Sequence, residues 1–134
     1  MAVFLDANVL FSSSNAGSAL HRLLHWVKDK EHLVTSAYAA AEAARNIALK
    51  RPAWAATHRI LMPAIAIVAE APLLLDVRLP DKDKPILGSA IAARCGYLVT
   101  GDKRDFGHLY GSTIAEVHII SVLDFAKAMV DKHA

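Results

Sequence analysis

Cysteine is almost absent from this sequence, which contains Cys95 alone among its 134 residues. A single thiol excludes an internal disulfide, so we expect a fold that is held by its apolar core in a reducing compartment. The residues next to Cys95 include no base that could activate its thiol. We therefore interpret Cys95 as a small packing residue and not as a nucleophile.

Long apolar runs without charge are also missing. The longest, at about residues 60–69, is far shorter than a membrane span and contains Pro63. The amino-terminal residues lack the basic segment and following apolar core that mark a signal peptide. These absences predict a cytoplasmic protein that does not enter the membrane.

Neither sign of charge dominates the sequence. The 15 Lys and Arg residues and 13 Asp and Glu residues give a formal net charge of +2, which allows an anionic partner without requiring one. Hydrophobic residues are abundant, at 54%, and many of them are alanine, as in closely packed helices. The length and this composition predict one domain, residues 1–134, with a core of its own.

Short apolar runs alternate with segments of helical periodicity along the chain. The helix at 37–50 has Ser36 as its expected N-cap and Pro52 as its stop, and Gly96 is the expected stop of the helix at 86–94. The runs 65–68 and 73–75 are too short to assign to a strand or a helix. The other expected elements are strands at 2–5, 32–35, 97–99 and 117–120 and helices at 20–27, 53–62 and 123–130. This alternation predicts a three-layer α/β/α sandwich around a mainly parallel sheet.

Acidic residues follow two of the predicted strands. Asp6 comes after the first strand and Asp102 after the strand at 97–99, so the two would face each other at the carboxyl edge of the sheet if these strands are neighbours. Asp83 enters from the turn before the 86–94 helix, and Glu42 lies on a helix that can cross the same edge. Each aspartate alone also fits a helix cap or a turn. Together, four clustered carboxylates need a cation to offset their repulsion, and oxygen ligands suit Mg²⁺ or Mn²⁺.

The same residues lie in motifs that resemble those of a known family. The segment 3–10, Val-Phe-Leu-Asp-Ala-Asn-Val-Leu, resembles the opening motif of the PIN-domain ribonucleases, which include VapC-like toxins and stand-alone PIN proteins. Segments 83–87 and 98–106 resemble the closing motif, and Glu42 matches the intermediate acid. The ordered set covers nearly the whole chain, so the resemblance implies a PIN-like fold and a Mg²⁺- or Mn²⁺-dependent endoribonuclease.

The resemblance also implies roles for individual residues. The catalytic and metal-binding acids would be Asp6, Glu42, Asp83 and Asp102, with Asp81 as the competing choice for the third position. Asp105 matches an auxiliary acid, and Asn8 and Thr100 match polar residues that steady the site. The residues expected to hold the RNA backbone around the acidic centre are Lys82, Lys84, Lys103 and Arg104.

The partners implied by the resemblance are RNA, a second copy of the chain and, for a toxin of a toxin–antitoxin pair, a cognate antitoxin protein. Residues 53–62 and the preceding helix are the candidate dimer contact. Two alternatives remain at this stage. The first is a non-catalytic PIN module that binds RNA or a protein, and the second is an aspartyl-phosphate-type phosphatase. A phosphatase of that type requires a second aspartate two residues after the first, where this chain has Asn8.

Overall fold

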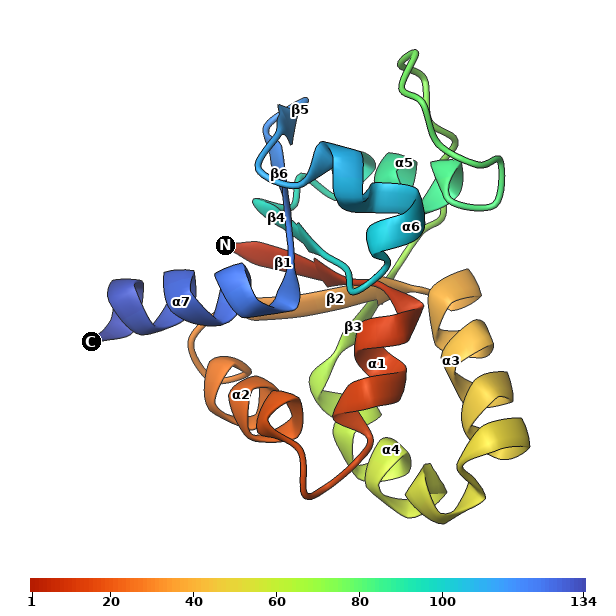
Figure 1. The fold of residues 1–134 in the computed structure, drawn as a ribbon, viewed down its shortest axis with the longest axis vertical. Helices are drawn as coiled ribbons and strands as arrows, with labels where there is room; N and C mark the ends of the chain where they lie inside the picture. The colour runs from red at the N-terminus through yellow and green to blue at the C-terminus, as the bar shows by residue number, and fades with distance from the viewer.

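The computed structural model describes all 134 residues and contains one six-stranded sheet between layers of helices (Figure 1). The order of strands across the sheet is β3-β2-β1-β4-β6-β5. Every neighbouring pair is parallel except β5 and β6. The strands are β1 (Ala2–Leu5), β2 (His32–Ser36), β3 (Ala66–Val68), β4 (Tyr97–Val99), β5 (Thr113–Ile114) and β6 (Val117–Ile120).

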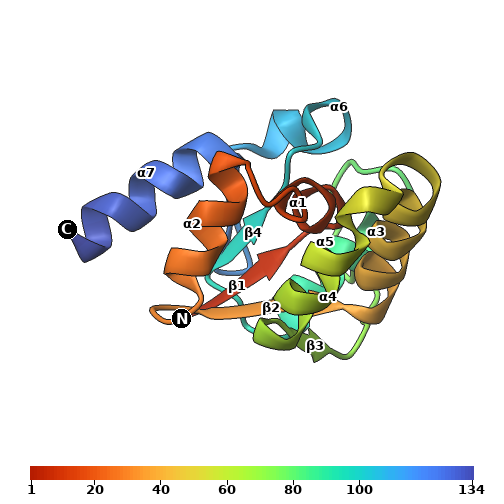
Figure 2. The same ribbon diagram turned by 90° about the horizontal axis from the view of Figure 1, so that it is seen from below.

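Helices cover both faces of this sheet, as the predicted α/β/α sandwich requires. Helices α1 and α2 pack with α3, α4 and α7 on one face, and Figure 2 shows α2 and α4 in front of the strands. Helix α5 crosses the other face, where it contacts β2 and β4. None of the helices has the length and apolar character needed to cross a membrane. The helices are α1 (Ala7–Ser13), α2 (Ala19–Val27), α3 (Ala37–Lys50), α4 (Ala55–Leu61), α5 (Lys84–Ala92), α6 (Lys103–Phe106) and α7 (Val122–His133).

The sheet is built from two successive halves of the chain. Strands β1, β2 and β3 precede residues 69–83, the segment without helix or strand, and β4, β5 and β6 follow it. The two halves meet where β1 pairs with β4, with Leu5 opposite Val99. Both strands are continuously apolar and are buried after their half-buried first residues, as is usual for parallel strands covered on two faces. This pairing brings the residues after β1 and β4 to the same edge of the sheet.

The end of helix α7, in the second half of the chain, is bonded to the first half through the buried carboxylate of Glu31. The side chain of Glu31 is 1% exposed, and its oxygens accept hydrogen bonds from Lys132 Nζ at 2.8 Å, His133 Nε2 at 2.7 Å and the amino group of Met1 at 3.1 Å. Burial alone would raise the pKa of Glu31, but these three donors outweigh it and lower the pKa to about 2. The cluster fixes α7 beside the turn that follows α2.

Most elements predicted from the sequence are confirmed. Helix α3 spans Ala37–Lys50, and the side chain of its N-cap Ser36 accepts a hydrogen bond from the Ala39 amide. Of the two unassigned runs, the first contains β3, whereas the second, at 73–75, forms neither a helix nor a strand. Strand β5 and helices α1 and α6 were not predicted from the sequence.

The prediction that Gly96 ends the helix before β4 is wrong. Helix α5 ends at Ala92, and Arg94 takes the left-handed conformation, with φ 55°. A Cβ atom at Gly96 would lie 2.4 Å from Sδ of Met1, which belongs to an exposed side chain that can move aside. Gly96 therefore lies against the start of β1 and does not end the helix.

Candidate metal centre

A cavity of about 320 Å³ lies at the carboxyl edge of β1 and β4. All four acids predicted as catalytic, Asp6, Glu42, Asp83 and Asp102, line it directly. Helix α1 supplies Phe11 and Asn8 to the wall, and α3 supplies one face with Glu42, Asn46 and Lys50, spaced four residues apart. The complete lining is Asp6, Ala7, Asn8, Phe11, Glu42, Asn46, Lys50, Lys82, Asp83 and Asp102.

Asp6 is 4% exposed and is held by hydrogen bonds at both carboxylate oxygens. Its Oδ1 accepts from the Ala7 amide at 2.7 Å, which caps α1, and its Oδ2 accepts from Thr100 Oγ1 at 2.8 Å and Asn8 Nδ2 at 3.3 Å. Burial raises the pKa of Asp6, and the charge of Glu42 adds to this effect, while the hydrogen bonds oppose it. The Asp6 carboxylate therefore caps α1 and lines the cavity at the same time.

Asn8 and Thr100 connect the ends of the two strands. Asn8 Nδ2 lies 3.3 Å from Thr100 Oγ1, and Asn8 Oδ1 accepts from the Gly101 amide at 2.7 Å. Thr100 is fully buried, and its Oγ1 also accepts from the Asp102 amide at 3.1 Å. Together these bonds position Asp6 relative to Asp102. The two residues thus lie where the predicted steadying role would require.

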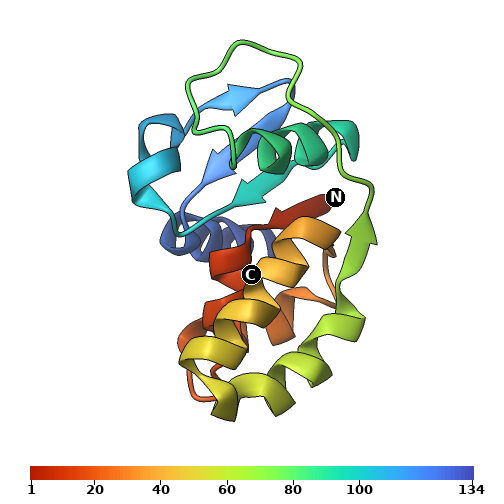
Figure 3. The same cartoon turned by 90° about the vertical axis from the view of Figure 1, so that its right-hand side faces the viewer.

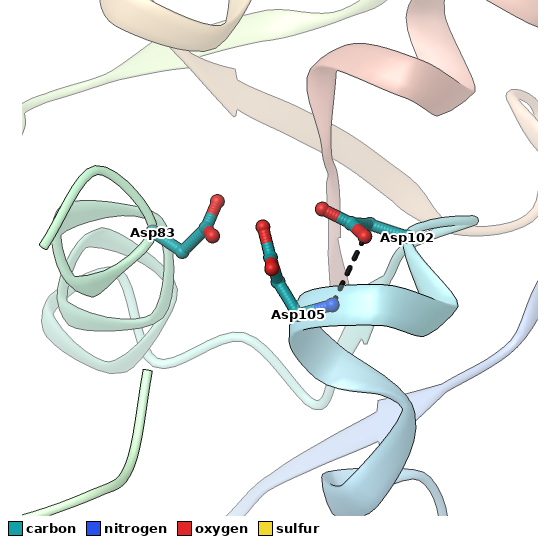
Figure 4. Close-up of side chains that lie close together, drawn as sticks. All are labelled: Asp83, Asp102 and Asp105. Carbon is teal, nitrogen blue, oxygen red and sulfur yellow. Dashed lines mark hydrogen bonds between the residues drawn. The ribbon is translucent and has the colours of Figure 1, made fainter. Parts of the chain in front are cut away.

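The closest group of carboxylates is formed by Asp83, Asp102 and Asp105 (Figure 4). One oxygen from each lies within 4.8 Å of the others. Asp102 caps α6, with Oδ1 accepting from the Asp105 amide at 3.1 Å, and this single helical turn carries the Asp105 side chain back toward Asp83. Asp105, which was predicted as an auxiliary acid, is therefore a member of the carboxylate group itself.

The pKa values of the neighbouring Asp83 and Asp105 are shifted in opposite directions. Burial is the main reason that the pKa of Asp83 is raised to about 7, and the adjacent Asp105 adds to the effect. Interaction with the protonated Asp83 in turn lowers the pKa of Asp105, with help from Lys82, whose Nζ lies 3.3 Å from Asp105 Oδ2. Without a further cation, the group therefore retains a proton near neutral pH.

The cluster suits a divalent cation. Asp83 Oδ2 is buried and has no hydrogen-bond partner, an arrangement that costs free energy unless a cation or proton satisfies the oxygen. Asp102 and Asp105 add carboxylate oxygens, which are the preferred ligands of Mg²⁺ and Mn²⁺, and Lys82 is the one basic group beside them. The residues present thus fit the metal that the sequence predicted.

The structure separates the two candidates for the third acid. Asp83 is 7% exposed and faces the cavity, whereas the side chain of Asp81 is 98% exposed and pairs with Lys84 at 3.1 Å. Among the basic residues predicted to hold RNA, Lys82 lines the cavity and Arg104 lines a neighbouring hollow. Lys84 and Lys103 line neither of them.

Two polar residues of the cavity, Asn46 and Lys50, were not predicted from the sequence. Both follow Glu42 at four-residue intervals on α3, so helical spacing from Glu42 is the signal that could have found them. Their amide and ammonium groups make the α3 side of the cavity suitable for binding an anion.

The pKa of Asp83 leads to an expected pH dependence of stability. A folded-state pKa raised above the unfolded value means that stability is complete below the unfolded pKa and is lost as pH rises through about 7. Each unit by which the pKa differs between the folded and unfolded states corresponds to about 1.4 kcal/mol in the free energy of unfolding. The lowered pKa of Asp105 adds no slope in this range, because a carboxyl with a lowered pKa loses its contribution to stability only at more acidic pH. From Asp83 we expect the protein in EDTA to lose roughly 2 kcal/mol between about pH 5 and pH 8.

Thermal and urea unfolding in EDTA across this range would measure that loss. Asp83→Asn cannot ionise and should remove most of the slope, while Asp81→Asn should retain it. Parallel curves for the wild-type protein and Asp83→Asn would contradict the expected role of Asp83.

The mainly parallel sheet in this strand order, with acids at the carboxyl edge of β1 and β4, is a PIN-domain fold of the VapC-like type. The chain is similar in structure to a chain in the crystal structure of VapBC2 from Rickettsia felis bound to a DNA fragment from their promoter. The TM-score is 0.66 at 16% sequence identity, over 90% of this chain and 98% of that chain. No protein-family model matches the sequence, and no curated protein matches it either.

Proposed function

We propose that this protein is a metal-dependent endoribonuclease that hydrolyses phosphodiester bonds in RNA. The observation that carries the proposal is the buried, unpartnered Oδ2 of Asp83 in a group of carboxylates, with Asp102 and Asp105, whose oxygens lie within 4.8 Å of one another. An apolar or purely structural site would have no reason to keep this oxygen without a donor. The PIN-like fold supports a nuclease in particular.

The metal would be held by Asp83 and Asp102 from the second half of the chain and by Asp6 and Glu42 from the first, with Asp105 as the auxiliary acid. When bound, Mg²⁺ or Mn²⁺ activates water and stabilises the charge that develops on the phosphoryl group. Asn8 and Thr100 hold the Asp6 carboxylate in one orientation, through contacts of 3.3 Å and 2.8 Å. The predicted products are a 5′-phosphate and a 3′-hydroxyl.

Basic side chains on two sides of the acids would orient the RNA backbone. Lys50 and Asn46 line the cavity from α3, and Lys82 lines it from the opposite segment. Lys82 is bonded to Asp105, and its pKa is raised mainly by that hydrogen bond. Lys84 and Lys103, which line neither cavity, keep a predicted role in RNA binding at longer range.

The contacts of Asn8 support this hydrolysis over the aspartyl-phosphate mechanism. Asn8 stands where the general acid of such a phosphatase would be needed, and its amide is committed to Asp6, Thr100 and Gly101. An amide also cannot donate a proton to a leaving group as a carboxylic acid does. A mechanism without a protein nucleophile fits the residues better.

We also propose that the protein is the cytoplasmic toxin of a toxin–antitoxin pair and has a cognate antitoxin partner. The support is its likeness to a chain of the VapBC2 complex, which was solved on promoter DNA. A homodimer through α3 and α4 is part of the proposal. Leu49 and Ile60, one on each helix, are each 80% exposed and would supply apolar area for it.

The central experiment is cleavage of total RNA by the purified protein with Mn²⁺, with Mg²⁺ and with EDTA. Cleavage should require a divalent ion and should be lost in Asp102→Asn, whereas Asp131→Asn, an exposed acid on α7, should cleave normally. Mn²⁺ should also raise the melting temperature of the wild-type protein, by an amount equivalent to about 2.7 kcal/mol at 100 times its Kd. Failure to cleave with either ion, or cleavage that persists in EDTA and in Asp102→Asn, would overturn the proposal.

A further inference from the structure

A second hollow, of about 390 Å³, adjoins the carboxylate cluster. Asp105 belongs to both, because it lies near Asp83 and Asp102 on one side and lines the hollow on the other. Figure 3 shows that α6 and residues 69–83 lie on one side of the end of β1 and that α3 lies on the other. The hollow is lined by residues from 78–80 and 104–108, whereas Lys50 lines the acidic cavity from α3. The complete lining of the hollow is Arg78, Leu79, Pro80, Arg104, Asp105 and His108.

Two guanidinium groups in this hollow have no partner within the protein. Arg78 and Arg104 are exposed and form no ion pair, although other basic groups of the chain form six such contacts. The nearby charge of Asp105 is already countered, since its Oδ2 lies 3.3 Å from Lys82 Nζ. The hollow thus presents two positive charges that are available to a ligand.

His108 holds the segments that carry these arginines together. Its Nε2 lies 2.8 Å from the backbone oxygen of Arg78. A carbonyl oxygen can only accept, so Nε2 must carry the proton and donate it. This bond attaches residues 69–83 to the helical turn Gly107–Leu109, which follows α6, and keeps Arg78 on the same hollow as Arg104.

We propose that Arg78 and Arg104 form a phosphate subsite for the RNA backbone next to the bond that is cleaved, with His108 as a positioning residue. The inference rests on the proposed ribonuclease function. It specifies that this hollow would bind a phosphate group next to the cleaved bond. The planar guanidinium presents paired donors that match two oxygens of one phosphate. With Lys50 lining the acidic cavity from α3, the RNA chain would be held at two separate positions beside the metal centre.

The test measures RNA binding without cleavage, in the Asp102→Asn background. The probe is a fluorescein-labelled single-stranded oligouridylate of about ten nucleotides, a length that exceeds the smallest single-strand sites of about four. Its Kd is measured by anisotropy at several salt concentrations. Arg78→Ala with Arg104→Ala should weaken binding about tenfold and reduce the salt slope by about 0.7 for each lost phosphate contact. Arg78→Lys with Arg104→Lys should restore most of the slope, because the charge is kept.

Arg22→Ala is the matched control, since it removes one exposed arginine on α2 that lines neither cavity. It should leave the Kd and the slope unchanged, and the Mn²⁺-induced thermal shift should be the same in the double alanine variant and its parent. If the wild-type protein cleaves RNA but the double alanine variant binds the probe like Arg22→Ala, the subsite is refuted and the ribonuclease proposal stands. If the wild-type protein neither cleaves RNA nor binds the probe, both proposals fall.

Discussion

Replacing Asp83 with asparagine should lower RNA cleavage by at least about a hundredfold, because even the outer partners of metal ligands typically contribute 10- to 100-fold. The substitution keeps the size of the side chain but removes the charge and replaces one oxygen with an amide. The oxygen at stake is buried and accepts no hydrogen bond from the protein. The same variant should be more stable than the wild-type protein in EDTA at about pH 8, since it removes a carboxylate whose ionisation is unfavourable in the folded state. Activity and stability should therefore change in opposite directions.

Asp81→Asn provides a control that differs only in position. Its side chain is 98% exposed, and its ion pair with Lys84 is an exposed one of the kind that contributes little. We expect cleavage within about twofold of the wild-type rate, as for other isolated surface pairs. Cleavage rates and melting temperatures of the two variants, measured with and without Mn²⁺, show whether Asp83 or Asp81 is the third acid. Loss of cleavage in Asp81→Asn alone would reverse the assignment of the third acid.

Gly88→Ala should destabilise the protein, although alanine normally stabilises a helix relative to glycine by about 1 kcal/mol. Gly88 lies within α5, under the segment that returns toward the site. A Cβ atom there would lie 2.5 Å from the backbone oxygen of Ala71 and 2.5 Å from backbone atoms of Pro72. Backbone atoms cannot rotate away, so the segment must shift, and the hydrogen bond from the Ala71 amide to Ser89 Oγ at 3.0 Å would be strained with it. We expect a loss of about 3 kcal/mol, at the upper end of the usual cost of overpacking.

Urea unfolding would measure this loss, with Gly107→Ala as the control. Gly107 has φ −56°, and the nearest atom to its added Cβ would be Lys103 Cβ at an ordinary 3.8 Å. The Gly107 variant should be neutral or slightly stabilised. If Gly88→Ala were equally tolerated, the segment over α5 would have to be far less firmly packed than the structure indicates.

The facing pair of acids was predictable from the sequence for a clear physical reason. Continuous apolar runs at 2–5 and 97–99 predict buried parallel strands, and parallel strands end at the same edge. The register of Leu5 opposite Val99 places Asp6 beside Thr100, two residues before Asp102, so both acids line the same cavity. The approach of Glu42 also followed from the helix that Ser36 caps.

The remainder of the site depends on features that periodicity does not encode. Asp105 reaches Asp83 because Asp102 caps a helix of a single turn, and a four-residue helix leaves no repeating pattern in the sequence. Arg78 lies in a segment without regular structure, and only the packing of that segment against α5 and His108 brings it to the hollow. Helix α1 was missed because serines follow its apolar residues, and their hydroxyls bond back to the Leu10 carbonyl at 3.0 and 2.9 Å and favour a turn in local statistics.

The division of the sheet at β1 and β4 means that neither half of the chain contains all the acids of the candidate centre. Residues 1–75 carry Asp6 and Glu42, and residues 76–134 carry Asp83, Asp102 and Asp105. The exposed bond between Leu75 and Asp76 therefore offers a place to express the protein as two fragments whose complementation alone would restore a complete ligand set. Under the proposed function, neither fragment alone should cleave RNA, so cleavage by a mixture of the two would show that they associate.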